Sequence, residues 1–148
     1  MSDAPVLTGG CQCGAVRFRV EGEVGRASIC WCRMCQKAFA GPFGALVTVN
    51  VADLIWTRAW PSTFQSSDAV KRGFCAACGT PLTFEWSEDK IDLAAFAFDD
   101  PSKVEPAVQL AVESRPAWTE HLVDLPVRPP AGGPYGTVVS RQHPDHET

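Results

Sequence analysis

The sequence lacks a long apolar run and a leader-like beginning. No stretch approaches the roughly 18 consecutive apolar residues that a membrane span needs. The first ten residues, MSDAPVLTGG, have neither the basic region nor the apolar segment of a secretion signal. We therefore expect a soluble, cytoplasmic protein with no membrane partner.

An excess of basic residues is also missing. The chain has 13 Lys and Arg against 17 Asp and Glu, a formal net charge of −4. Metal-bound thiolates would make this charge more negative. Nucleic-acid binding depends on lysine and arginine to neutralise phosphates. We therefore expect no nucleic-acid partner.

Internal repeats and low-complexity runs are absent from the body of the sequence. Its 148 residues, 45% of them hydrophobic, are enough for one domain with a core. Val16, Phe18 and Val20 alternate with Arg17 and Arg19, the period-2 pattern of a half-buried strand. Similar short, β-rich stretches follow at residues 43–50, 82–86, 90–98 and 107–113. These stretches predict a mostly β body.

Helical signal is confined to residues 33–39, which are too few to form a helix without tertiary support. From residue 123 onward, in VDLPVRPPAGGPYG, proline and glycine become dense and the apolar periodicity fades. We expect one domain over residues 1–128 and a loosely ordered tail over residues 129–148. Asp99 and Asp100, followed by Pro101, are typical of a turn.

The cysteines carry the chemical signal. There are seven of them, and an odd number cannot pair completely in disulfides. Disulfides are also disfavoured in a reducing compartment, so we favour metal binding or a reactive thiol. They fall into three groups: a first pair of Cys11 and Cys13, a triplet of Cys30, Cys32 and Cys35, and a second pair of Cys75 and Cys78.

The second pair, in FCAACGTPL, has the spacing of a zinc knuckle. Two intervening residues let both sulfurs face one ion, and Gly79 can adopt the backbone conformation that points amides at the sulfurs. Gly10 and Gly14 flank the first pair in the same way. If strands carrying the two pairs lie side by side, four cysteines complete a closed, structural shell.

The triplet is then left with three ligands and an open position, which is the pattern of a catalytic zinc. The open position would be taken by water or by a substrate thiol. The alternative is that one of its pairs shares a structural metal with another group while the remaining cysteines are buried small hydrophobes. A division into four and three uses every cysteine, so we predict two zinc ions per chain.

Three segments, GGCQCGAVRFRV, CWCRMCQKAFAGPFGA and FCAACGTPL, resemble the signature blocks of the glutathione-dependent formaldehyde-activating (GFA) family, also called the centromere protein V/GFA domain family. The later ESRPAWTEHLVDLP is similar to the family's closing segment, so the likeness covers about residues 7 to 125. The resemblance implies an all-β, Mss4-like fold of short antiparallel strands. It also implies that the two pairs hold a structural zinc and the triplet a catalytic one.

The resemblance further implies a carbon–sulfur lyase acting on glutathione adducts, such as the S-hydroxymethylglutathione formed from formaldehyde and glutathione. Zinc suits this chemistry because it deprotonates a thiol that otherwise titrates near about 8.5. Many members carry histidine between the first two cysteines of the triplet, where this chain has Trp31. A proton shuttle by that side chain is therefore not available here.

Glutathione has two carboxylates, so cations near the cysteine segments are candidate contacts, although each can equally be an ordinary surface charge. They are Arg33, Lys37, Arg58, Lys71 and Arg72. Trp31 and Phe43 could line a pocket or belong to the core, and we favour the core for Phe39. His143 and His146 have a metal-compatible spacing, but their place in RQHPDHET favours solvated side chains. His121 could approach the second metal or serve a structural role.

Two other functions stay open. Water in the open position would make the protein a zinc hydrolase, but no obvious general base lies near the triplet in the sequence, Asp53 included. A non-catalytic zinc module that binds a partner is the other alternative, and the chain lacks the basic extension that nucleic-acid binding would need.

Overall fold

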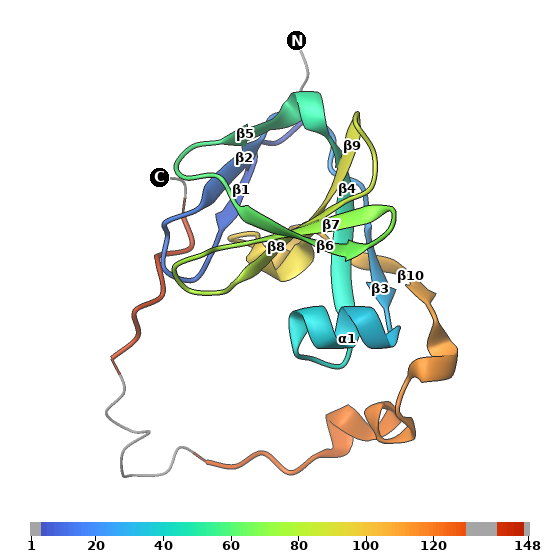
Figure 1. Ribbon diagram of the computed structural model, residues 1–148. Coiled ribbons are helices and arrows are strands. Elements are labelled where there is room, and N and C mark those ends of the chain that lie inside the picture. Colours follow the sequence, from blue (N-terminus) through green and yellow to red (C-terminus); the bar gives the residue numbers. More distant parts are fainter. Residues whose placement is uncertain (1–3, 130–138, 147–148) are drawn as a thin grey trace.

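The computed structural model describes residues 4–129 and 139–146. It contains two β-sheets and one short α-helix (Figure 1). The smaller sheet has the strand order β1-β2-β5 and is antiparallel. Its strands are β1 (Leu7–Gly10), β2 (Arg17–Val20) and β5 (Leu54–Trp56). The all-β fold predicted from the sequence is confirmed.

The larger sheet has the order β10-β3-β4-β9-β8-β7-β6. All its pairs are antiparallel except β10 with β3. Its strands are β3 (Ala27–Cys30), β4 (Gly44–Asn50), β6 (Ser62–Ser67), β7 (Val70–Phe74), β8 (Pro81–Glu85), β9 (Lys90–Ala94) and β10 (Pro106–Leu110).

Helix α1 spans Arg33–Phe39, as the sequence predicts, and lies between β3 and β4 in the chain. The other helical segments are short 3-10 turns. They are Val51–Asp53, Ala95–Ala97, Pro101–Lys103, Val112–Ser114 and Ala117–Asp124. Two of the predicted β stretches therefore end early, because residues 95–97 and 112–114 turn helical after β9 and β10. Within the described residues, no helix has the length and apolar character of a membrane span.

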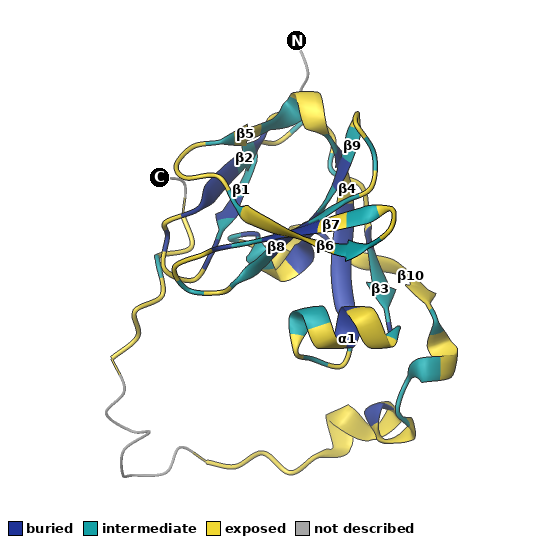
Figure 2. Ribbon diagram, in the orientation of Figure 1, coloured by how far each residue is buried: buried dark blue, intermediate teal, exposed yellow. Residues whose placement is uncertain are grey.

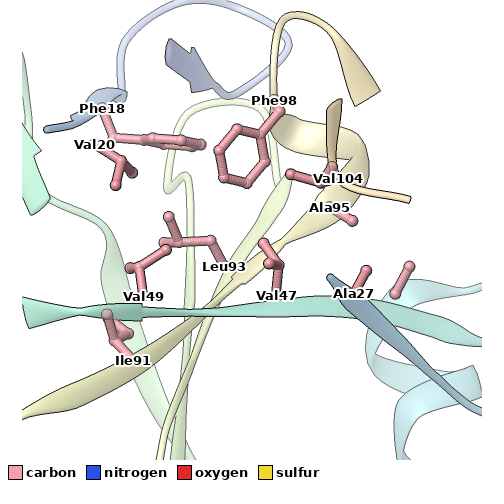
Figure 3. Packing of buried hydrophobic residues seen from close by; sticks show 11 residues of the cluster. Phe18, Val20, Ala27, Val47, Val49, Ile91, Leu93, Ala95, Phe98 and Val104 are labelled. Atoms are coloured by element: carbon pink, nitrogen blue, oxygen red, sulfur yellow. The ribbon is translucent and has the colours of Figure 1, made fainter. Parts of the chain in front are cut away.

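The main core packs apolar side chains of β2 against those of β4 and β9 (Figure 3). Phe18 is 1% exposed and meets the ring of Phe98 edge-on at 5.0 Å between centroids. Figure 2 shows the middle of β4 buried and the segment after β10 mostly exposed. Burying such side chains stabilises the fold by about 25 cal/mol per Å² of apolar surface. This core holds β3 and β4, and therefore the two ends of the α1 segment, in place.

Arg17 departs from the simple alternation of β2. A half-buried strand would turn it to solvent, yet its side chain is 3% exposed. Its guanidinium donates two hydrogen bonds to Asp99, at 2.8 and 2.6 Å, and Asp99 also accepts one from Thr8. Burial opposes ionisation of Asp99, but the Arg17 and Thr8 hydrogen bonds hold its pKa below the usual range. Asp99 therefore lies in the predicted bend and also forms an ion pair with Arg17 of β2.

The predicted tail falls partly on residues 130–138 and 147–148, which lie outside the described residues. The described part, residues 139–146, returns to the body of the molecule. The backbone N–H of His143 donates to the carbonyl of Gln12 at 2.7 Å, and Arg17 donates to the carbonyl of His146 at 2.9 Å. The described tail segment thus reaches the loop of the first cysteine pair, through His143 and Gln12.

Candidate metal centres

The two cysteine pairs come together into one group of four sulfurs. Cys11 and Cys13 follow β1, while Cys75 and Cys78 lie in the turn between β7 and β8. All four sulfurs lie within 4.8 Å of one another, with 3.6 Å between Cys11 and Cys13 and 3.8 Å between Cys13 and Cys75. A tetrahedral zinc with bonds of about 2.3 Å separates its sulfurs by about 3.8 Å. The four-cysteine group therefore fits one tetrahedral ion and is compatible with zinc.

Two glycines allow the turns that gather these sulfurs. Gly14 has φ +80° and Gly79 has φ +82°, a region that side chains other than glycine rarely adopt. The N–H of Gly79 donates to the carbonyl of Cys75 at 2.8 Å, and that of Gly14 to the carbonyl of Cys11 at 3.2 Å. Each glycine therefore closes a tight turn around its pair.

The four-cysteine group is continuous with the core. Cys11 is 4% exposed and Cys75 is 1% exposed, and both pack with Val16 and Leu82 in a second apolar cluster. The backbone N–H of Val16 donates to the Cys11 sulfur at 3.2 Å. A hydrogen bond of this kind stabilises a thiolate ligand, as expected around a structural metal.

Thr80 bridges the two halves of the four-cysteine group. Its hydroxyl lies 3.2 Å from the Cys78 sulfur and accepts a hydrogen bond from the Gln12 backbone at 3.0 Å. Burial raises the pKa of Cys78, but hydrogen bonds from Thr80 and from Cys13 together lower that pKa to about 6. Thr80 therefore favours the thiolate that a metal needs.

Replacing Thr80 by valine keeps the shape of the side chain and removes this hydroxyl. We expect the free energy of unfolding to fall by about 1 kcal/mol, the usual net value of one hydrogen bond. We also expect faster transfer of metal from the four-cysteine group to a chromogenic chelator. Thr80→Ser is the control because it keeps the hydroxyl. Equal metal-transfer rates for the two variants would show that the hydroxyl has no such role.

The triplet forms a separate group at the start of α1. Cys30 ends β3, Cys32 is the N-cap of α1, and Cys35 lies in its first turn. The backbone N–H of Cys35 donates to the Cys32 sulfur at 3.3 Å, so the cap itself orients one sulfur. The three sulfurs lie within 4.8 Å of one another. Among the described residues, no histidine, aspartate or glutamate joins them as a fourth ligand.

The thiols of the triplet differ in acidity. Burial, the largest influence, raises the pKa of Cys30 to about 12. Burial also opposes ionisation of Cys32, but hydrogen bonds from the Cys35 backbone and from neighbouring thiols lower its pKa. A bound metal ion would supply the positive charge that keeps all three sulfurs ionised. The donor set is therefore that of a soft metal ion with a thiolate preference.

Arg72 of β7 reaches the triplet from across the sheet. Its Nη2 donates to the Cys35 sulfur at 3.4 Å, and its Nε donates to the Ser66 hydroxyl at 2.8 Å. The guanidinium also lies over the ring of Phe84, 4.9 Å from its centroid. The side chain is 5% exposed, and within the described part of the chain it has no carboxylate partner. Its charge is therefore directed at sulfur.

A model of a known protein family matches the part of the chain that contains both cysteine groups. The family model described as glutathione-dependent formaldehyde-activating enzyme matches residues 6–114, which include all seven cysteines. This chain belongs to the GFA family.

One curated relative is a Halomonas elongata protein named "Putative glutathione-dependent formaldehyde-activating enzyme". It is 29% identical over 126 residues, which cover 78% of this chain and 80% of the relative. A crystal structure of a Rhodobacter sphaeroides protein superposes with a TM-score of 0.56 at 22% identity, over 69% of this chain and 98% of that one. The second likeness supports the fold alone.

The aromatic residues near the triplet of this GFA chain divide between core and pocket. Trp31 is 6% exposed, and its Nε1 donates to Gln109 at 2.9 Å. Its ring meets Phe43 edge-on at 5.1 Å. Phe39, expected in the core, is instead half-buried and lines a cavity, because it sits on the last turn of the short α1 at the molecule's edge.

The other four candidate cations have no described contact with a triplet sulfur. Arg33 is exposed and donates to Gln36, while Lys37 and Lys71 are also exposed. Arg58 donates to the carbonyl of Gly14, beside the four-cysteine group. Of the five candidate cations, Arg72 alone has a described contact with a triplet sulfur. The sequence pattern alone does not distinguish Arg72 from the other four cations, because its contact with Cys35 joins residues 37 positions apart.

The remaining candidates lie elsewhere. His121 is exposed and pairs with Asp124 at 3.7 Å. Asp53 accepts a hydrogen bond from Asn50 at the end of β4. His143 and His146, with ring centroids 6.2 Å apart, belong to the returning segment and join neither cysteine group as ligands among the described residues.

Proposed function

We propose that this GFA protein is a zinc-dependent carbon–sulfur lyase acting on adducts of glutathione or a related thiol. The simplest such adduct is S-hydroxymethylglutathione, made from formaldehyde and glutathione. The observation that carries the proposal is the separation of seven cysteines into a complete group of four and an incomplete group of three. Family membership and the name of the Halomonas relative support it.

The two groups have different roles in this proposal. The four-cysteine group is structural, because four thiolates leave no coordination position for a substrate. The triplet is catalytic, and its metal would supply a thiolate at neutral pH and a position for the substrate sulfur. We propose zinc for both, since closed and open thiolate shells of this size are typical of that ion. The seven free cysteines favour a reducing compartment, and we place the activity in the cytoplasm.

The reaction is an addition and its reverse. In one direction the substrate sulfur attacks the carbonyl carbon, a carbon–sulfur bond forms, and the π pair of the carbonyl moves to oxygen, which then takes a proton. The protein's own contribution is to hold the sulfur beside Cys30, Cys32 and Cys35 and to stabilise negative charge. Arg72, buried and directed at Cys35, offsets part of the thiolate charge there.

Hydrolysis is a weaker candidate for the triplet. A three-thiolate shell makes the metal a poor Lewis acid and a poor activator of water. A hydrolase would also need a general base beside the water, and no carboxylate or histidine joins the triplet among the described residues. A soft thiol, in contrast, is well matched to a soft, electron-rich shell.

Cobalt substitution tests the proposal directly. We expect the sulfur-to-cobalt charge-transfer band to grow as glutathione is added to the Co²⁺-loaded protein. S-Methylglutathione, whose sulfur cannot form a thiolate, is the matched control and should leave the band unchanged. The zinc protein should also accelerate S-hydroxymethylglutathione formation.

Two outcomes would overturn the proposal. An unchanged band together with turnover of simple esters or amides would indicate a zinc hydrolase. An unchanged band without turnover of any kind would indicate a binding module.

A further inference from the structure

A cavity of about 250 Å³ lies between α1 and the strands β6 to β8. Its apolar wall includes Phe39 of α1, Phe64 of β6, Phe74 of β7 and Pro81 of β8. Phe64 is 48% exposed at the mouth, and its ring lies 6.1 Å from that of Phe74. The one charged side chain in the described lining is Arg72.

The cavity borders the triplet. Arg72 lines it and also contacts the Cys35 sulfur. Phe39 and Cys35 flank the same backbone position: a Cβ added to Gly44 would lie 2.9 Å from the Phe39 ring and 3.2 Å from the Cys35 Cβ. Two walls of the cavity are therefore in the immediate surroundings of Cys35.

The guanidinium is fixed before any ligand arrives. Its Nε donates a hydrogen bond to Ser66 and its Nη2 donates one to Cys35. Its flat face lies over the Phe84 ring. A guanidinium has five N–H donors, and these contacts use two of them. A buried cation without a carboxylate partner, facing an apolar space, favours a ligand with an apolar body and an oxygen acceptor.

The volume of the cavity favours a ligand with a large apolar group. A dry cavity of about 150 Å³ is enough to hold benzene. The space here is larger, so an aromatic or branched aliphatic group fits, whereas formaldehyde would leave most of the apolar wall without contacts.

We propose that this cavity binds the carbonyl partner of the thiol, and that this partner is an apolar aldehyde larger than formaldehyde, with its oxygen directed at Arg72. The proposal rests on the proposed thiol-addition function. As the carbon–sulfur bond forms, the carbonyl π pair becomes an oxyanion, Arg72 stabilises it, and the proton lost by the thiol returns to that oxygen through solvent. Arg72 is then a catalytic residue that replaces water as the oxyanion's partner.

Binding of benzoate tests the cavity without any turnover. Benzoate carries an aromatic body and an anionic oxygen, and benzylamine is its cationic control. We expect calorimetry on the zinc-loaded protein to show benzoate binding and no benzylamine binding. Arg72→Met should weaken benzoate 10- to 100-fold, the range for losing a charge-assisted hydrogen bond. If Arg72→Met does not fold, Arg72→Lys and Ser66→Ala test the same contact more gently.

Phe64→Ala tests the apolar wall at a partly exposed position, away from the cysteines. It should weaken benzoate about tenfold. Phe96→Ala is the matched control: Phe96 is 72% exposed and lines a neighbouring cavity with no charged side chain among its described residues, so benzoate affinity should not change. Equal benzoate affinity in the wild type, Arg72→Met and Phe64→Ala would overturn the proposal.

Turnover then tests the substrate class. We expect kcat/KM for addition of glutathione to exceed the formaldehyde value at least tenfold for an aldehyde of benzaldehyde size, and Phe64→Ala to remove most of that preference. A preference for formaldehyde would overturn the inference. The cobalt response to glutathione is measured separately from benzoate binding. If only the cavity proposal fails, the thiol-addition function still stands. If the cobalt test fails, that function is excluded even if benzoate binds.

Discussion

Replacing Cys78 by serine is expected to leave a chain that cannot fold stably. The four-cysteine group is built into the core, with Cys75 1% exposed and packed against Leu82. Serine is a far weaker metal ligand than a thiolate. A structural zinc contributes on the order of 10 kcal/mol, comparable to the whole stability of a domain. We expect insoluble protein, or soluble protein with lost β-type circular dichroism and less than one zinc per chain.

Cys32→Ser is the matched comparison, because it removes one sulfur of the same kind from the other group. Cys32 is partly exposed at the N-cap of α1, and serine is itself a good N-cap. We expect a folded protein with one tightly held zinc and no thiol-addition activity. A folded, active Cys78→Ser and an insoluble Cys32→Ser would show that the two groups have exchanged roles.

The cysteine grouping could be predicted from the sequence because spacing alone restricts which sulfurs can share an ion. Two residues between Cys75 and Cys78 place both sulfurs on one side of a turn, and the glycine after the pair allows that turn. Helix α1 was predicted from the sequence only as a short segment that needs tertiary support. The structure supplies what the sequence did not show, since Cys32 caps the helix.

Other parts of the fold depend on contacts between distant residues, which local pattern does not contain. The local pattern of β2 predicts that Arg17 faces solvent, but in the fold it pairs with Asp99, 82 positions later in the chain. Arg72 likewise resembles a surface cation in the sequence, but in the fold its side chain contacts Cys35 of α1. Strand β6, from Ser62 to Ser67, is polar and mostly exposed, so it has no apolar alternation to reveal it.

The strand β7 links the two cysteine groups. Arg72 contacts the triplet through Cys35, and Cys75, three residues later, belongs to the four-cysteine group. The turn that the four-cysteine group closes therefore fixes the end of the strand that carries Arg72. We expect loss of the four-cysteine group to disturb the triplet more than the reverse, because α1, which carries Cys35, contributes no residue to the main core.

This arrangement predicts that the two metals leave in order. With increasing chelator we expect one equivalent of zinc to be released first, from the triplet, because three thiolates and an exchangeable position hold an ion less tightly than a closed shell of four. Circular dichroism should remain native after this first release. The second equivalent should leave only at higher chelator concentration and together with unfolding, because Cys11 and Cys75 become accessible only when the core around them opens. Cys32→Ser should show the second release alone, at the same chelator concentration as the wild type. Simultaneous loss of both ions with unfolding at every chelator concentration would contradict the division into a structural and an exchangeable site.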